Sequence, residues 1–223
     1  MAQKTDLNVA PYYDDFDSTD NFHKILFRPG FAVQARELTQ LQSILQNQIE
    51  RHGNNIFKDG TVIVPGQMSF SNAYDSVKLA TTFGGEDVVP AQYYNASSPL
   101  IITGATSGVQ AEVVGYKDGT STSQPTLYVK YIKTGNDYAT ETFSDSENIS
   151  ANASITHTTA YASNIASATT HTSASQTGSA AKVETGIYYV RGQFVRVAEQ
   201  TLVLSDSSTT VSQRVGFTVT ETL

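Results

Sequence analysis

The acidic residues near the N-terminus are the first group whose types and spacing could do chemistry. Asp14, Asp15, Asp17 and Asp20 supply the oxygen ligands that calcium prefers. A calcium loop of the EF-hand type needs oxygen ligands at alternating positions and a glycine at the sixth. Counted from Asp15, the fifth position is Thr19 and the sixth is Asp20, so the pattern does not match. The residues favour a solvated acidic arm, or an arm whose carboxylates pair with arginine on a neighbouring molecule.

Histidine and cysteine usage indicates neither a metal centre nor a cofactor. His23, His52, His157 and His171 stand at no spacing that is typical of zinc ligands. The chain has no cysteine, which excludes disulfides, thiolate nucleophiles and cysteine-ligated zinc. No Gly-x-Ser-x-Gly nucleophile elbow occurs either.

Two further groups define alternative functions. A hydrolase acting on cell wall or capsule would need a carboxylate pair, for which Glu86 with Asp87 and Asp145 with Glu147 are candidates by proximity alone. A receptor- or glycan-binding module would use the tyrosines of "AQYYNASSP", residues 91–99, because aromatic rings stack on sugars. We expect the chain not to be an enzyme.

Composition narrows the class of partner. The 223 residues carry a net charge of −7, and the 14 lysines and arginines are scattered, which disfavours a nucleic-acid surface. No apolar run reaches membrane-spanning length. Charged residues make up only 16%, and serine and threonine take their place, as in assembled β proteins.

The element most able to position partner-binding residues is a helix predicted over residues 32–52. Its apolar residues recur at spacings of three and four, which marks one helix face: Leu38, Leu41, Ile44, Leu45 and Ile49. Polar residues, namely Glu37, Gln42, Gln46 and Glu50, are expected largely on the other face. Gly53 is predicted as the residue just past the helix end.

Two interpretations of this helix stay open. In the first, which we favour, the apolar face packs onto the chain's own β domain. In the second it packs against a copy of itself or another partner, which the uncharged glutamines around it would tolerate. The apolar stripe is too short for a free-standing coiled coil.

The rest of the chain predicts a mainly β protein with one long N-terminal helix, an α+β class with antiparallel sheets. Strands are expected at 61–64, 77–79, 100–103, 109–116 and 126–133, the last two as a hairpin. "GIYYVRGQFVRV" predicts two strands around Arg191–Gly192, and "TLVL" and "RVGFTVTETL" predict more.

We therefore divide the sequence into consecutive segments. An extended arm (1–20) carries Tyr12, Tyr13 and Phe16, which we expect to dock on something because exposed aromatics are unfavourable. The others are a helical anchoring segment (21–60), a β domain (61–149), a low-complexity segment rich in Ser, Thr and Ala (150–181), and a β segment (182–223) that we expect to continue in a longer parent protein. For 150–181 we favour an inserted loop over small-residue strands packed in an assembly.

Two blocks of sequence resemble a family of structural proteins in the virions of contractile-tailed bacteriophages. The first is "YYDDFD" with "NFHKILFRPGFAVQARELTQLQSILQNQIERHGNNIFKDGTVIVPG", and the second is "GIYYVRGQFVRVAEQTLVL" with "RVGFTVTET". Members of that family are described as baseplate wedge, tail-fibre or virion structural proteins.

The resemblance implies a tail protein without catalytic residues that assembles through its arm and helix. Its partners would be other tail or baseplate proteins and symmetric copies of itself, and it would be located in the virion after assembly in the host cytoplasm. The residues expected to bind partners are Tyr12, Tyr13, Phe16, Arg36, Leu38, Leu41, Gln42, Leu45 and Ile49.

Overall fold

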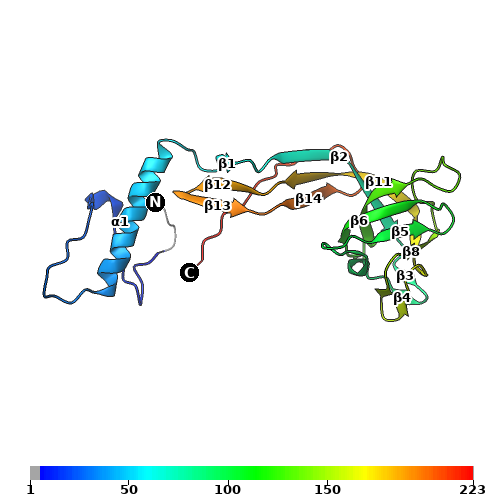
Figure 1. The fold of residues 1–223 in the computed structure, drawn as a ribbon, viewed down its shortest axis with the longest axis horizontal. Helices are drawn as coiled ribbons and strands as arrows, with labels where there is room; N and C mark the ends of the chain where they lie inside the picture. The colour runs from blue at the N-terminus through cyan, green and yellow to red at the C-terminus, as the bar shows by residue number, and fades with distance from the viewer. Residues whose placement is uncertain (1–5, 223) are drawn as a thin grey trace. The chain divides into compact units, whose positions relative to one another are not determined.

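The computed structural model of the protein describes residues 6–222 and confirms the predicted class (Figure 1). Antiparallel sheets dominate, and the described residues hold a single α-helix. The chain forms two compact units, and they differ from the predicted consecutive segments. Unit 1 holds the residues up to 69 together with 182–200 and those from 214 onward, and unit 2 holds 70–181 and 201–213.

Unit 2 is built on a closed ring of strands. The order in its main sheet is β14-β11-β2-β7-β6-β5-β8, and β8 also pairs with β11, so the six strands from β11 to β8 close on themselves. Their bounds are β2 (Met68–Leu79), β5 (Ile101–Gly104), β6 (Gln110–Lys117), β7 (Thr126–Lys133), β8 (Asn148–Ala151), β11 (Ala166–Val183) and β14 (Gln200–Ser205). Closure leaves these strands without free edges where they pair.

Alternating side chains fill this barrel. Val113 pairs with Val129 across the predicted β6–β7 hairpin, which the structure confirms. Leu79, Ile102 and Ile149 are fully buried in the same core. Short elements surround the barrel: β3 (Thr82–Phe83), β4 (Glu86–Asp87), β9 (Ile155–Thr156), β10 (Ala160–Tyr161) and the 3-10 helix η2 (Pro90–Tyr93).

The prediction of a loop over residues 150–181 is wrong, because most of this segment is strand, including the 18-residue β11. Its small side chains are what close packing demands. Ser167, Ala168 and Ala174 are fully buried, and a Cβ at Gly178 would lie 2.9 Å from the carbonyl carbon of Asp206. A strand can therefore have low sequence complexity when its neighbours come too close for larger side chains.

Unit 1 contains the helix α1 (Ala35–Asn54), the 3-10 helix η1 (Ser18–Asp20) and a sheet of β1 (Val62–Val64), β12 (Gly186–Val190) and β13 (Gln193–Val197) in the order β1-β12-β13. The two strands predicted around Arg191–Gly192 are confirmed, and they form a hairpin: both residues have positive φ, and Val190 pairs with Gln193. The strand predicted over "RVGFTVTETL" is not formed in the described residues, 214–222. This segment is held by side chains instead, with Phe217 against Tyr188 and Arg191 bonded to Glu221.

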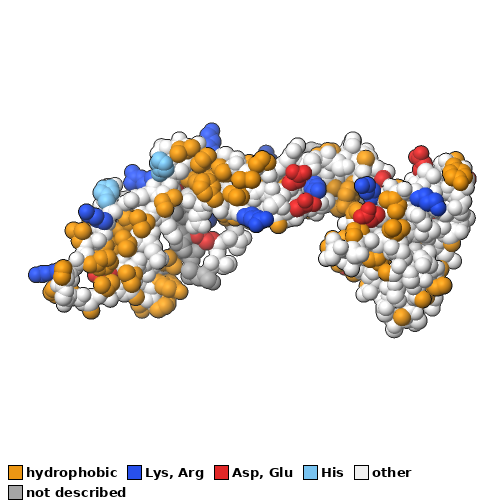
Figure 2. Space-filling model, in the orientation of Figure 1, with side chains coloured by type: hydrophobic (Ala, Val, Ile, Leu, Met, Phe, Trp, Pro, Cys, Tyr) orange, Lys and Arg blue, Asp and Glu red, His pale blue; other side chains and the backbone are white. Residues whose placement is uncertain are grey.

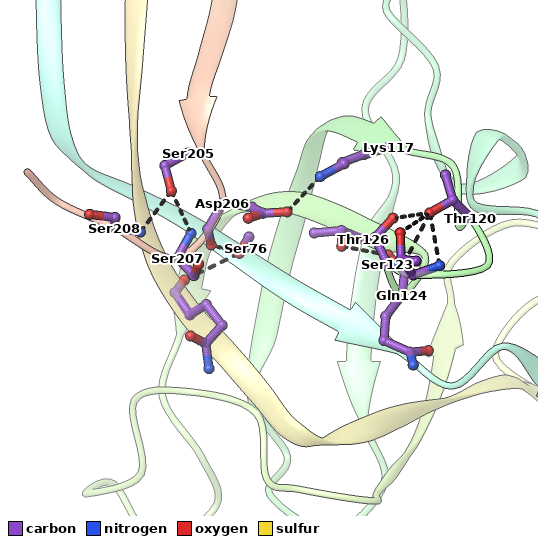
Figure 3. Close-up of polar contacts among 12 residues, drawn as sticks. Ser76, Lys117, Thr120, Ser123, Gln124, Thr126, Ser205, Asp206, Ser207 and Ser208 are labelled. Carbon is purple, nitrogen blue, oxygen red and sulfur yellow. Dashed lines mark hydrogen bonds and ion pairs between the residues drawn. The ribbon is translucent and has the colours of Figure 1, made fainter. Parts of the chain in front are cut away.

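Polar contacts hold the turn after β14 on the barrel (Figure 3). The Ser76 hydroxyl donates to the backbone carbonyl of Asp206 at 2.9 Å, and Lys117 Nζ donates to the Asp206 carboxylate, also at 2.9 Å. The hydrogen bond from Lys117 lowers the pKa of Asp206 from its ordinary value of 3.8.

The substitution Asp206→Asn should therefore lower stability in a pH-dependent way. A carboxyl group whose pKa is lowered by folding stabilises the protein above its unfolded pKa, and this contribution disappears as the pH falls through the folded value. Because the ion pair is partly exposed, we expect a loss of about 0.5 kcal/mol in the free energy of unfolding at pH 7 and a smaller loss at about pH 3, below the ordinary pKa of 3.8. Urea unfolding at both pH values measures it.

Asp118→Asn is the matched control, since Asp118 is an exposed carboxylate that directly follows Lys117 in the sequence. The backbone bond from Ser76 remains in Asp206→Asn, so the test isolates the carboxylate. An equal loss at both pH values would contradict the assignment.

Candidate functional site

Unit 1 leaves much of its apolar surface uncovered. Among the described hydrophobic residues that are buried, only Ile44, Val183, Tyr188 and Tyr189 belong to unit 1, whereas the main core cluster lies in unit 2. Hydrophobic side chains gather on the visible face of α1 and the segment before it (Figure 2). The exposed large hydrophobic residues up to position 56 are Val9, Tyr12, Tyr13, Phe22, Leu26, Phe27, Phe31, Val33, Leu38, Leu45, Ile49 and Ile56. Such a surface is typical of an interaction site.

The acidic arm docks on the helix of its own chain. The Ser43 hydroxyl donates to the carboxylate of Asp14, a residue that is only 7% exposed. Gln40 Nε2 donates to Asp15 at 2.9 Å, and Arg36 lies 3.6 Å from the same carboxylate. Asp14 and Asp15 therefore find hydrogen-bond partners within the chain. The arginine beside Asp15 is Arg36 of its own chain.

The helix begins where its first turn is capped. Glu37 accepts a hydrogen bond from the backbone N–H of Gln34 at 2.9 Å, which completes a capping box. This fixes the first helical residue at Ala35, three residues later than predicted.

Only part of the predicted apolar stripe turns toward its own chain. Ile44 is 2% exposed and Leu41 is half-buried, but Leu38 is 52%, Leu45 49% and Ile49 59% exposed. The favoured interpretation was that the stripe packs onto the chain's own β domain. It is therefore wrong for Leu38, Leu45 and Ile49. The reason is that the arm supplies carboxylates, which draw the polar side of the helix inward.

The predicted polar face is also divided. Glu50 is buried at 6% exposure, whereas Gln42 and Gln46 are exposed. Gln42 stands four residues after Leu38 and three before Leu45, so it shares their exposed face.

The end of the helix is fastened to the β12–β13 hairpin. Gly53 is a buried helical residue, not the residue beyond the helix, and its place is set by Tyr189. A Cβ at Gly53 would lie 2.8 Å from Cζ of the Tyr189 ring, whose hydroxyl donates to Asn54 Oδ1 at 3.0 Å. Phe57 and Phe194 complete the aromatic cluster, with ring centroids 5.3 Å and 5.9 Å from Tyr189.

The other predicted partner-binding residues lie on the same unit. Tyr12 and Tyr13 are 42% and 56% exposed, Arg36 is exposed, and Phe16 is half-buried. Residues not chosen from the sequence add to this surface, namely Phe22, Leu26, Phe27 and Phe31, of which Leu26 is 79% exposed. The apolar run "FHKILF" was the available signal for them.

The candidate hydrolytic carboxylates make structural hydrogen bonds. Buried Glu147 accepts from the backbone N–H groups of Thr106, Ser107 and Ser144 at 2.7–3.0 Å. Asp145 accepts from the backbone of Ala174 at 2.8 Å.

Glu86 accepts from the backbone N–H groups of Thr158 and Thr159, at 3.2 Å and 2.8 Å. The hydrogen bond from the Thr159 side chain lowers the pKa of Glu86, so this carboxyl is held ionised. Glu86 and Asp87 form the short strand β4.

The two tyrosines of the candidate sugar-binding loop differ in their exposure to solvent. Tyr93 is fully buried, burial raises its pKa, and its hydroxyl bonds to Ser167 at 2.8 Å. Tyr94 is 37% exposed and faces Tyr116, which is 39% exposed, with ring centroids 5.7 Å apart. The exposed aromatic pair is therefore Tyr94 with Tyr116.

Comparison with known proteins finds one family. Residues 10–83 match a domain of unknown function (DUF4815), a region that contains the second half of the arm, the apolar segment 22–27 and α1. No curated protein matches the chain, and no solved structure does. Within residues 6–222, no helix has the length and apolar character needed to cross a membrane.

The fastening of the helix predicts an unusual response to Gly53→Ala. Within a helix this change stabilises by up to about 1 kcal/mol, and Gly53 is the second-last residue of α1. Here we expect a loss of helical circular dichroism at 222 nm and a lower melting temperature, because the new methyl meets the Tyr189 ring.

Gly216→Ala is the control, since a Cβ there meets nothing within 4 Å. A gain in helicity on Gly53→Ala would show that Tyr189 moves aside without loss.

Proposed function

We propose that this chain is a structural protein of a bacteriophage tail, either a baseplate wedge component or a fibre protein attached to the baseplate. It binds neighbouring tail or baseplate subunits through the N-terminal arm and helix, in a virion that is assembled in the host cytoplasm. The observation that carries this proposal is the uncovered apolar surface of unit 1.

The contrast between the units supports an assembly role. Unit 2 buries its own core, so its fold does not call for a neighbour. Burial of exposed apolar area stabilises by about 25 cal/mol per Å², and unit 1 still exposes residues as large as Phe22, Leu26 and Phe31. Phe22, Leu26 and Phe31 lie within residues 10–83, which match the domain family. The sequence of this region resembles phage virion proteins.

The chain's presence in particles tests the tail assignment. Mass spectrometry of purified virions of the phage that encodes it should find the chain in the tail fraction. Virions that lack the chain would overturn the proposal.

The aromatic arm gives a residue-level prediction. The double change Tyr12→Ser and Tyr13→Ser should reduce incorporation into particles by roughly tenfold or more, since interface aromatics often contribute above 1 kcal/mol each. Quantitative immunoblotting of particles from a complemented deletion phage measures it.

Tyr138→Ser is the matched control, because Tyr138 is 89% exposed and belongs to unit 2. Normal incorporation of the arm variant would show that the arm is not part of the interface. An equal loss of incorporation in the control variant would show the same.

The exposed pair Tyr94 and Tyr116 favours a second candidate function, binding of surface glycans on the host. Neighbouring rings offer faces on which a sugar can stack, and Tyr94 and Tyr116 keep 37% and 39% of their surface exposed.

If this is correct, a glycan array should give signals above background that fall at least about tenfold in Tyr94→Ala and Tyr116→Ala, because each variant removes one stacking face. Tyr138→Ala serves as the control. An array without signal for the unmodified chain would remove this candidate.

A further inference from the structure

We infer that α1 pairs with the α1 of a second copy of this chain, in parallel, along an exposed seam made of Leu38, Gln42, Leu45, Ile49 and His52. The inference names a partner for the helix and rests on the proposed structural function for its purpose.

The seam has the spacing of a coiled-coil contact. Its residues are separated by four, three, four and three positions, an average of 3.5, and all of them lie within α1. This is the spacing of a and d positions in a coiled coil, and an ideal helix drifts from it by only about 20° per heptad, so the seam can face a second helix over its whole length. All five residues are exposed, so the seam has no partner among the described residues of its own chain.

A helix that pairs with this seam must come from another molecule. The described chain has one α-helix, and its inward face already holds the arm and the hairpin. A copy of α1 brings the matching spacing, with Leu38 and Leu45 in d positions and Gln42 and Ile49 in a positions.

Charge favours a copy over a charged partner. The positions that flank the seam are Thr39, Leu41, Gln46 and Gln48, which carry no formal charge. The chain has a net charge of −7, yet two identical seams meet here without like-charge repulsion. The charged residues of the helix lie off the seam: Arg36 pairs with Asp15, and Glu50 is buried beside the hairpin.

Gln42 determines that the two helices pair in parallel. Its amide both donates and accepts, so two copies in parallel register satisfy each other at this level. An antiparallel pairing would set a positions against d positions, with the amide facing Leu45, where it would lose its hydrogen-bond partner. Isoleucine at a with leucine at d favours two strands, and a single polar a residue fixes the register.

The length of the seam sets its strength. Five residues make about two heptads, fewer than a free-standing coiled coil requires. Pairing by the isolated chain should therefore be weak and concentration-dependent, and it should tighten in an assembly that holds copies close together.

Analytical ultracentrifugation of the full chain over a range of concentrations tests the pairing. Gln42→Ile should tighten self-association by roughly tenfold or more, because it replaces an amide with a buried apolar side chain. Leu45→Asp should abolish association. Tyr138→Asp is the control, since Tyr138 is 89% exposed and belongs to unit 2, and it should leave association unchanged.

Crosslinking tests the direction. The chain has no cysteine, so Gln42→Cys introduces a single thiol that should form an inter-copy disulfide at least about tenfold faster than Arg51→Cys, an exposed position off the seam. Equal rates, or a chain and a Gln42→Ile variant that both stay monomeric, would overturn the inference.

These outcomes separate the pairing from the proposed function. A chain that is monomeric but present in tails loses the pairing and keeps the function. A chain that pairs through the seam but is missing from virions keeps the pairing and loses the proposed function.

Discussion

Burial of apolar surface is the constraint on which this structure depends, and the two units meet it differently. In unit 2 the six-stranded ring encloses residues such as Val77, Ile102 and Leu127, which are fully buried. Unit 1 has a helix and a three-stranded sheet with few buried hydrophobic residues. A unit that exposes this much apolar surface gains stability from a neighbour, and this is the physical ground for reading the protein as a component of an assembly.

Ring closure depends on a strand in which small side chains predominate. β11 pairs with β8 and is also hydrogen-bonded to β2 and β14, so its residues must tolerate close neighbours. Ser167, Ala174 and Gly178 do so, and the Tyr93 hydroxyl reaches Ser167. The composition that resembles a loop is therefore a packing requirement, since hydroxyl and methyl groups fill a barrel wall where leucine would not fit.

The helix is held at two places by contacts far apart in the sequence. Asp14 and Asp15 hold its polar side, and Tyr189 holds its end at Gly53. With both places occupied by its own chain, the helix keeps one face exposed. The arm thereby decides which face of an amphipathic helix is available for binding.

The sequence alone determined the fold class, the β6–β7 hairpin and the Arg191–Gly192 turn, because these follow from local periodicity and from turn residues that accept positive φ. It also predicted the helix, to within three residues at its start. Only the tertiary structure decided that Gly53 lies inside the helix, that residues 166–183 form a strand, and that Leu38, Leu45 and Ile49 face outward. Each of these depends on a partner more than 25 residues away, such as Tyr189 for Gly53 or Asp14 for Ser43, and local patterns carry no information on which distant group will come close.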